Sequence, residues 1–203
     1  MKHHRVILMI MIIGIASFLT GCASTPKVER IEVDKIIDIS GRWNDTDSRL
    51  VAEDMIRDCL KQPFLEKFKS KKNRVPTFIV GLIKNRSHEH INVQTFVKDL
   101  ERALINSGRV QFVASKGERG QIREERLDMA KHASEDTMKG PGEEVGADFM
   151  LIGAINTVRD EAGGKAIMYY QVNLELIATA NNVKAWVGEK KIKKLIKKPR
   201  LSW

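Results

Sequence analysis

The first residues of the chain limit what the rest can fold into, because they have the layout of a secretory signal. Lys2 and Arg5 lie ahead of an apolar run that extends from Val6 to Leu19. A basic start followed by such a run is typical of a signal that is removed after export rather than folded. We therefore predict that residues 1–21 are a signal peptide, and that roughly 180 residues remain to form one domain.

The residues that end this run resemble the lipobox of bacterial lipoproteins. Leu19-Thr20-Gly21-Cys22 places a small residue directly before a cysteine and a leucine three residues before it. The resemblance implies that Cys22 becomes the first mature residue and carries fatty chains that hold the protein to a membrane, with residues 22–37 as a tether. The alternative is a signal anchor that stays in the bilayer, but its apolar run of about 14 residues is shorter than the ~20 that a spanning helix needs.

The net charge of +9 is concentrated near the C-terminus. Residues 189–203 carry seven Lys and Arg side chains against the single acid Glu189, whereas residues 22–188 are nearly neutral. An exported lipoprotein does not meet nucleic acid, so we expect no nucleic-acid partner. The basic segment instead favours an anionic membrane or an acidic partner. We predict residues 189–203 as a basic C-terminal tail, which either continues the last strand or stands free.

The pattern of apolar residues predicts an α/β (α+β) fold for residues 38–188. A turn at 38–48 leads into a helix capped by Asp47 or Ser48, which ends at Pro63 and buries Cys59 as an inert thiol. The later segments predict a mixed sheet with a C-terminal antiparallel meander, flanked by helices. Strands are expected at 74–85, 110–113, 146–155, 165–178 and 183–189, and helices after Asn92 and at 118–135, the latter lying on the sheet or acting as a lid.

Two stretches are similar to known envelope proteins. The segment DISGRWNDTDSRLVAEDMI at 38–56 closely resembles the opening of the LpoB family of lipoproteins. The segment VGADFMLIGAI at 145–155 is similar to the strand entry that this family shares with the N-terminal domain of TolB. The resemblance implies a sheet of the TolB N-terminal kind flanked by helices, in agreement with the order of elements above.

The same resemblance implies a function without catalysis. Members of the LpoB family sit on the periplasmic side of the outer membrane, where they bind a class A penicillin-binding protein and activate this bifunctional peptidoglycan synthase. Ala23 after Cys22 is compatible with sorting to the outer membrane. The tether here is short and contains only Pro26, whereas the best-known members carry a long linker rich in Pro and Gln. The alternative function is that of a structural or assembly lipoprotein in a trans-envelope or secretion complex.

The sequence offers no convincing catalytic or metal-binding constellation, so we expect no enzyme, no metal and no cofactor. Ser87-His88-Glu89-His90 is the one cluster that suggests a metal or a hydrolase. Two histidines two residues apart rarely bind one ion, and no second pair completes a ligand set. A solvated loop explains these residues more simply.

For the partner-binding surface, the sequence points to the meander and to one turn. Tyr169, Gln171 and Asn173 alternate with the apolar Tyr170, Val172 and Leu174, so they are expected on the outer face of the sheet. The hypothesis also includes the basic residues Arg159 and Lys165 and the aromatic–guanidinium pair of Trp43 and Arg42. The full set is Arg159, Lys165, Tyr169, Gln171, Asn173, Arg42 and Trp43. For Trp43 the alternative is that its ring closes the edge of the core while Arg42 packs over it.

Overall fold

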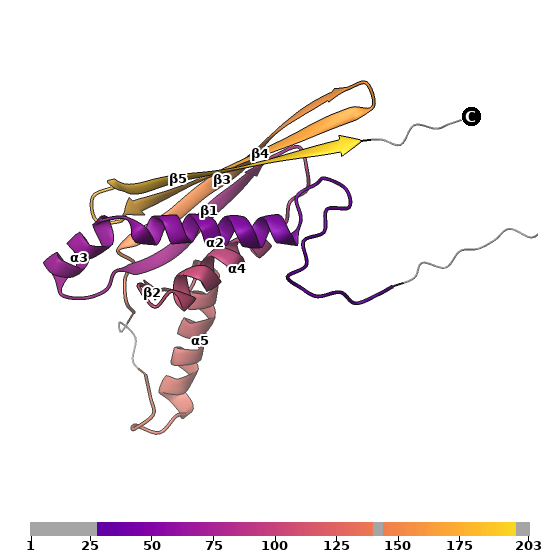
Figure 1. Ribbon diagram of the computed structural model, residues 1–203. Coiled ribbons are helices and arrows are strands. Elements are labelled where there is room, and N and C mark those ends of the chain that lie inside the picture. Colours follow the sequence, from indigo (N-terminus) through magenta and orange to yellow (C-terminus); the bar gives the residue numbers. More distant parts are fainter. Residues whose placement is uncertain (1–27, 140–143, 198–203) are drawn as a thin grey trace, which may run out of the picture. The chain divides into compact units, whose positions relative to one another are not determined.

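The computed structural model describes residues 28–139 and 144–197 (Figure 1). The predicted signal peptide and Cys22 lie outside these ranges. Contacts group the residues from Ile36 onward into one compact unit, separate from the segment that ends at Lys35. Within the described ranges no helix is long and apolar enough to cross a membrane. Residues 28–44 contain no strand.

A five-stranded mixed sheet organises the domain, and the predicted fold class is confirmed. Its strand order is β2-β1-β3-β4-β5; β1 runs parallel to β2 and β3, and β3, β4 and β5 form the antiparallel meander. The described elements are α2 (Asp45–Lys61), α3 (Phe64–Lys72), β1 (Thr77–Arg86), α4 (Val93–Asn106), β2 (Gln111–Phe112), α5 (Lys116–His132), β3 (Phe149–Ala162), β4 (Lys165–Ala178) and β5 (Lys184–Lys197).

The helices α2 and α4 pack against each other and cover one face of the sheet (Figure 1). Helix α2 begins three residues earlier than expected, because Asn44 caps it and Asp47 completes a capping box by accepting the Asn44 N–H. The sequence pattern instead predicts the cap at Asp47 or Ser48, and neither is the capping residue. It also missed α3, which follows Pro63 directly. Asn92 caps α4 as expected. Cys59 is fully buried, and burial raises the pKa of its thiol to about 12, which keeps it protonated.

Trp43 closes the edge of the core at the start of α2. Its half-buried ring makes edge-on contacts with Phe96 at 5.9 Å and with Tyr170 at 5.6 Å between ring centres. Its backbone N–H and the Tyr170 hydroxyl both donate to the same carboxylate oxygen of Glu89, at 3.2 Å and 2.8 Å. Burial, followed by the contact with Glu89, raises the pKa of Tyr170. This geometry matches the core-edge alternative for Trp43.

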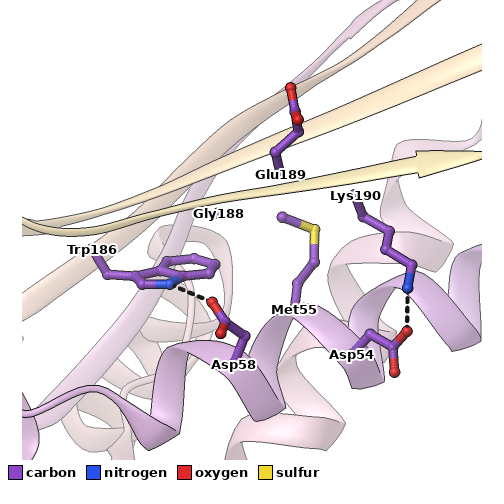
Figure 2. A pocket seen from close by; sticks show the side chains of 7 residues that line it. All are labelled: Asp54, Met55, Asp58, Trp186, Gly188, Glu189 and Lys190. Carbon is purple, nitrogen blue, oxygen red and sulfur yellow. Dashed lines mark hydrogen bonds and ion pairs between the residues drawn. The ribbon is translucent and has the colours of Figure 1, made fainter.

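Of the two alternatives for the basic segment, the described part follows the first, because β5 continues through 189–197 and pairs with β4 along its length. On its inner side, β5 is joined to α2 by polar contacts at four-residue intervals, two of which Figure 2 shows. The Trp186 indole N–H donates to Asp58 at 2.8 Å, and the Lys190 ammonium binds Asp54 at 2.5 Å. Glu189 points to the opposite side of the strand (Figure 2). These contacts line a pocket of about 250 Å³ whose inner charged groups are already paired.

Lys194 makes the third contact of this series and connects three segments of the chain. Its ammonium donates to Asp38 at 2.5 Å, to Asp47 at 2.6 Å and to the Arg42 carbonyl at 3.2 Å. Only 9% of the Lys194 and Asp47 side chains is exposed. Burial raises the pKa of Asp47 despite the ion pair. Burial alone would lower the pKa of Lys194, but its hydrogen bonds to Asp38 and Asp47 outweigh this effect and raise it.

Helix α5 differs from the other helices because none of its residues is buried. Its N-terminus is fixed by a capping box between Ser115 and Glu118, and Glu118 also binds Lys98 of α4. Further along, Arg119, Arg123 and Arg126 surround Glu144. Figure 1 shows α5 running away from the sheet, so the predicted charged helix is present but does not lie on the strands.

We predict that Lys194→Met lowers the free energy of unfolding by about 3 kcal/mol or more, because it leaves the buried Asp47 without its counter-charge. Urea denaturation followed by circular dichroism measures the change. The matched control is Lys193→Met, which changes the adjacent, exposed lysine on the other face of β5 and should alter stability by less than about 0.5 kcal/mol. Equal stability of the two variants would contradict the proposed role of Lys194.

Trp43→Ala should also destabilise the domain, by about 2–4 kcal/mol, because it removes the ring that packs on Phe96 and Tyr170. Trp43→Phe keeps an aromatic ring there and should retain most of the stability. The same urea experiment compares the two. An alanine variant as stable as the wild type would show that Trp43 is a surface residue and not part of the core.

Candidate interaction surface

The sheet has one face that none of the helices in the described ranges covers. Along β4, the side chains of Tyr170, Val172 and Leu174 point toward the helices and are completely buried. The alternate residues Tyr169, Gln171 and Asn173 are only half-buried, so the predicted alternation along this strand is confirmed. We call this side of the sheet the open face, and the pairing register identifies residues that point to it. On β1 and β3 they include Leu82, Lys84 and Arg86, and Met150, Ile152, Ala154, Asn156, Val158 and Asp160. On β4 and β5 they include Lys165, Ile167, Tyr169, Gln171, Asn173 and Glu175, and Val187, Glu189, Lys191, Lys193, Leu195 and Lys197.

The open face exposes apolar side chains from several strands at once. Leu82 of β1 is 66% exposed, Val158 of β3 61%, Val187 of β5 60% and Leu195 of β5 57%. In β1, burial is nearly complete only over the first half of the strand. Leu82 and Val187 lie at the level of Ile152, and Val158 and Leu195 lie beside Ile167 toward the other end of the face. Isolated apolar residues on a surface are common, but groups spread over neighbouring strands are typical of an interaction site.

A shallow hollow of about 420 Å³ lies between β1, β3 and β4 on this face. Leu82, Ile152 and Ala154 give it apolar walls. Polar and charged side chains complete the lining, namely Lys84, Arg86, Asn156, Asn173 and Glu175. A mixture of apolar groups with amides and guanidinium is the composition of a protein-binding surface, and the hollow offers no set of groups that would perform a reaction.

The charge of the open face is predominantly positive along β4 and β5. Lys165 and Lys197 are paired directly across the two strands, and Tyr169 pairs with Lys193. Two like charges opposite each other are unfavourable unless a third group lies between them. Glu189, at the middle of β5, binds Lys191 and Gln171 and lies eight residues along the strand from Lys197. An acidic group on a partner would therefore be favoured at the Lys165–Lys197 end of this ladder.

The structure brings Lys165, Tyr169, Gln171 and Asn173 together on the open face, but it does not place Arg159 there. Arg159 is paired with Met168, whose side chain is buried on the helix side, and directly paired residues point to the same face of an antiparallel sheet. Arg159 therefore faces the other way, where it forms an ion pair with Glu161. Arg42 is exposed on that same helix side, in the turn next to Trp43.

The histidine loop contributes no ligand set. His88 lies with its ring nitrogens 3.2 and 3.3 Å from the Thr157 hydroxyl, which joins the end of β1 to β3. Glu89 is engaged with Trp43 and Tyr170. Across the ranges 28–139 and 144–197, no group of three His, Cys, Asp or Glu side chains is placed to share a metal ion.

Several solved structures are similar to this chain. The LpoB domain of Salmonella enterica is 14% identical over 73% of this chain and 99% of that domain, with a TM-score of 0.44. The solution structure of Escherichia coli LpoB is 13% identical over 87% of this chain and 85% of that one, with a TM-score of 0.36. Lipoprotein GNA1162 of Neisseria meningitidis is 12% identical over 59% of this chain and 83% of its own, with a TM-score of 0.39. No curated protein sequence matches the chain.

A family model settles the relationship. The model described as "Peptidoglycan-synthase activator LpoB" matches residues 47–192. This range runs from the first turn of α2 to the middle of β5 and therefore includes both the helix-covered core and the open face. Because the match extends over more than half of the sequence, the chain belongs to the LpoB family of peptidoglycan-synthase activators.

Proposed function

We propose that this protein is an outer-membrane lipoprotein, anchored on the periplasmic side through Cys22, that binds a class A penicillin-binding protein and activates it allosterically. The protein contributes no catalytic group and needs no cofactor. Its family is one of synthase activators, which supports a regulatory role and a penicillin-binding protein as the partner. The sequence from Leu19 to Cys22 supports the anchor.

The observation that carries the proposal is the open face. It combines exposed apolar side chains, the half-buried Tyr169, and a row of lysines with few acidic partners. Two apolar areas lie toward the ends of this face, with a polar band around Gln171 and Asn173 between them. Such a mixture of apolar, aromatic and polar groups is common at protein interfaces. Among the residues predicted from the sequence, Lys165, Tyr169, Gln171 and Asn173 would contact the synthase.

Activation by contact alone requires that the domain bind one conformation of the synthase more tightly than the other. A ligand shifts a conformational equilibrium only by its differential affinity for the two states, and about 1.4 kcal/mol changes that equilibrium tenfold. The antiparallel ladder of β4 and β5 suits this purpose, because its backbone is fixed over 14 residues in each strand and loses little freedom on binding.

The short tether restricts where the synthase can be met. Residues 22–37 reach at most about 55 Å when fully extended. The domain therefore stays close to its own membrane, and we propose that the synthase extends toward it. The proposal predicts that lengthening the tether is tolerated, whereas removal of the fatty chains from Cys22 is not.

A pull-down from detergent-solubilised membranes tests the proposed partner. The full chain as bait should retain a protein that is labelled by fluorescent penicillin. The doubly substituted variant Tyr169→Ala with Lys193→Glu should retain at least about tenfold less, because it removes an aromatic contact and reverses a charge on the open face. The control is Arg159→Glu, a charge reversal on the opposite side of the sheet, which should bind like the wild type.

Two results would overturn the proposal. One is retention of the synthase by the Tyr169/Lys193 variant together with its loss in Arg159→Glu, which would place the interface on the helix side. The other is the absence of any penicillin-labelled band, with recovery of a large outer-membrane assembly instead, which would favour the role of an assembly lipoprotein.

A further inference from the structure

A second pocket lies on the helix side of the sheet, beyond the N-terminal end of α2. Its volume is about 350 Å³, which is at the lower end of the range for small-molecule sites. It is lined by Ser40, Arg42, Glu89, Arg159, Met168 and Ile196. The pocket is separate from the open face, because Met168, Arg159 and Ile196 point to the opposite side of their strands from Tyr169.

Glu89 gives this pocket a carboxylate whose position is fixed. One of its oxygens accepts hydrogen bonds from the Tyr170 hydroxyl at 2.8 Å and from the Trp43 N–H at 3.2 Å. No residue in the described part of the chain donates a hydrogen bond to the other oxygen. That oxygen is also not enclosed, because among the described residues no Glu89 oxygen is both buried and without a hydrogen-bond partner. Glu89 therefore offers one anchored carboxylate with an accessible acceptor.

Two guanidinium groups line the same pocket without neutralising Glu89. Arg159 forms its ion pair with Glu161, and neither arginine lies within 4.0 Å of the Glu89 carboxylate. Arg42 is exposed and has no ion pair with any described residue. Its backbone is nevertheless held in place, because the Arg42 carbonyl accepts from Lys194 and the Arg42 N–H donates to the Ser40 hydroxyl. The pocket thus presents separated opposite charges.

From this arrangement we infer that the pocket binds a small zwitterion, namely an amino acid or a short peptide with a free ammonium and a free carboxylate. The ligand carboxylate pairs with the Arg42 guanidinium, and the ligand ammonium pairs with the accessible oxygen of Glu89. A small aliphatic side chain then contacts Met168 and Ile196, which supply the apolar part of the wall. The inference does not depend on the synthase, because it concerns another side of the sheet.

The charge pattern also predicts which ligands the pocket does not bind. A ligand with only a carboxylate would be repelled by Glu89, and one with only an ammonium would be repelled by Arg42. Both charges must therefore be present, and the separation between them must match the span of the pocket. This double requirement distinguishes the site from a general patch of basic residues, which would bind any anion.

Isothermal titration of the full chain in detergent with the dipeptide alanylalanine tests the inference. Binding should weaken at least about tenfold when the dipeptide is N-acetylated or C-amidated, since each change removes one of the two ionic contacts. Arg42→Gln should abolish discrimination against the amide, and Glu89→Gln discrimination against the acetylated form. The glutamine at position 89 still accepts from Tyr170 and Trp43, and a thermal melt verifies that this variant is folded.

The matched control is Arg86→Gln, which removes an exposed guanidinium from the open face and should bind the dipeptide like the wild type. No binding of alanylalanine by the wild type up to 10 mM probe, on the order of the weakest specific affinities, would overturn the inference. Equal binding of the charged and capped dipeptides would overturn it as well. Neither result would affect the pull-down of the synthase, so the two proposals fail independently.

Discussion

The ammonium of Lys194 is the contact on which the arrangement of this domain depends. It binds acceptors from the turn before α2 and from α2 itself, while its own strand β5 is the last element of the sheet. With Lys190 and Trp186 it fixes α2 along the inner side of β5. Because α2 and α4 both lie on that side, no described helix covers the other side of the sheet, and the open face is a consequence of this packing.

The lysines of β5 have different roles on the two sides of the strand. Lys190 and Lys194 point inward and are bound by aspartates of α2 and the preceding turn, whereas Lys191, Lys193 and Lys197 point outward. The inner lysines stabilise the domain, and the outer ones give the open face its positive charge. An edge strand with lysines is also protected against pairing with other strands, which keeps a long exposed edge from aggregating. One basic segment therefore serves both folding and recognition.

Local patterns were sufficient to predict most of the sheet but not its long-range contacts. The alternation of Tyr169, Gln171 and Asn173 with larger apolar residues determines which side of β4 is buried, because a strand has a period of two. Arg159 was assigned to the wrong face although the signal was present: the two-residue turn Gly163-Gly164 pairs Ala162 with Lys165, and counting back from it places Arg159 beside Met168. Local patterns left open whether the basic segment continues the last strand, because the acids that bind Lys190 and Lys194 are more than 130 residues away.

The central claim is that the synthase binds the open face. Amide chemical shifts of the isotope-labelled domain, recorded with and without the purified synthase, test it residue by residue. We predict that the largest changes fall on the outward residues of β4 and β5, around Tyr169 and Lys193, and that α2 and α4 change little. Changes confined to α2, α4 or α5, with β4 and β5 unaffected, would contradict the account.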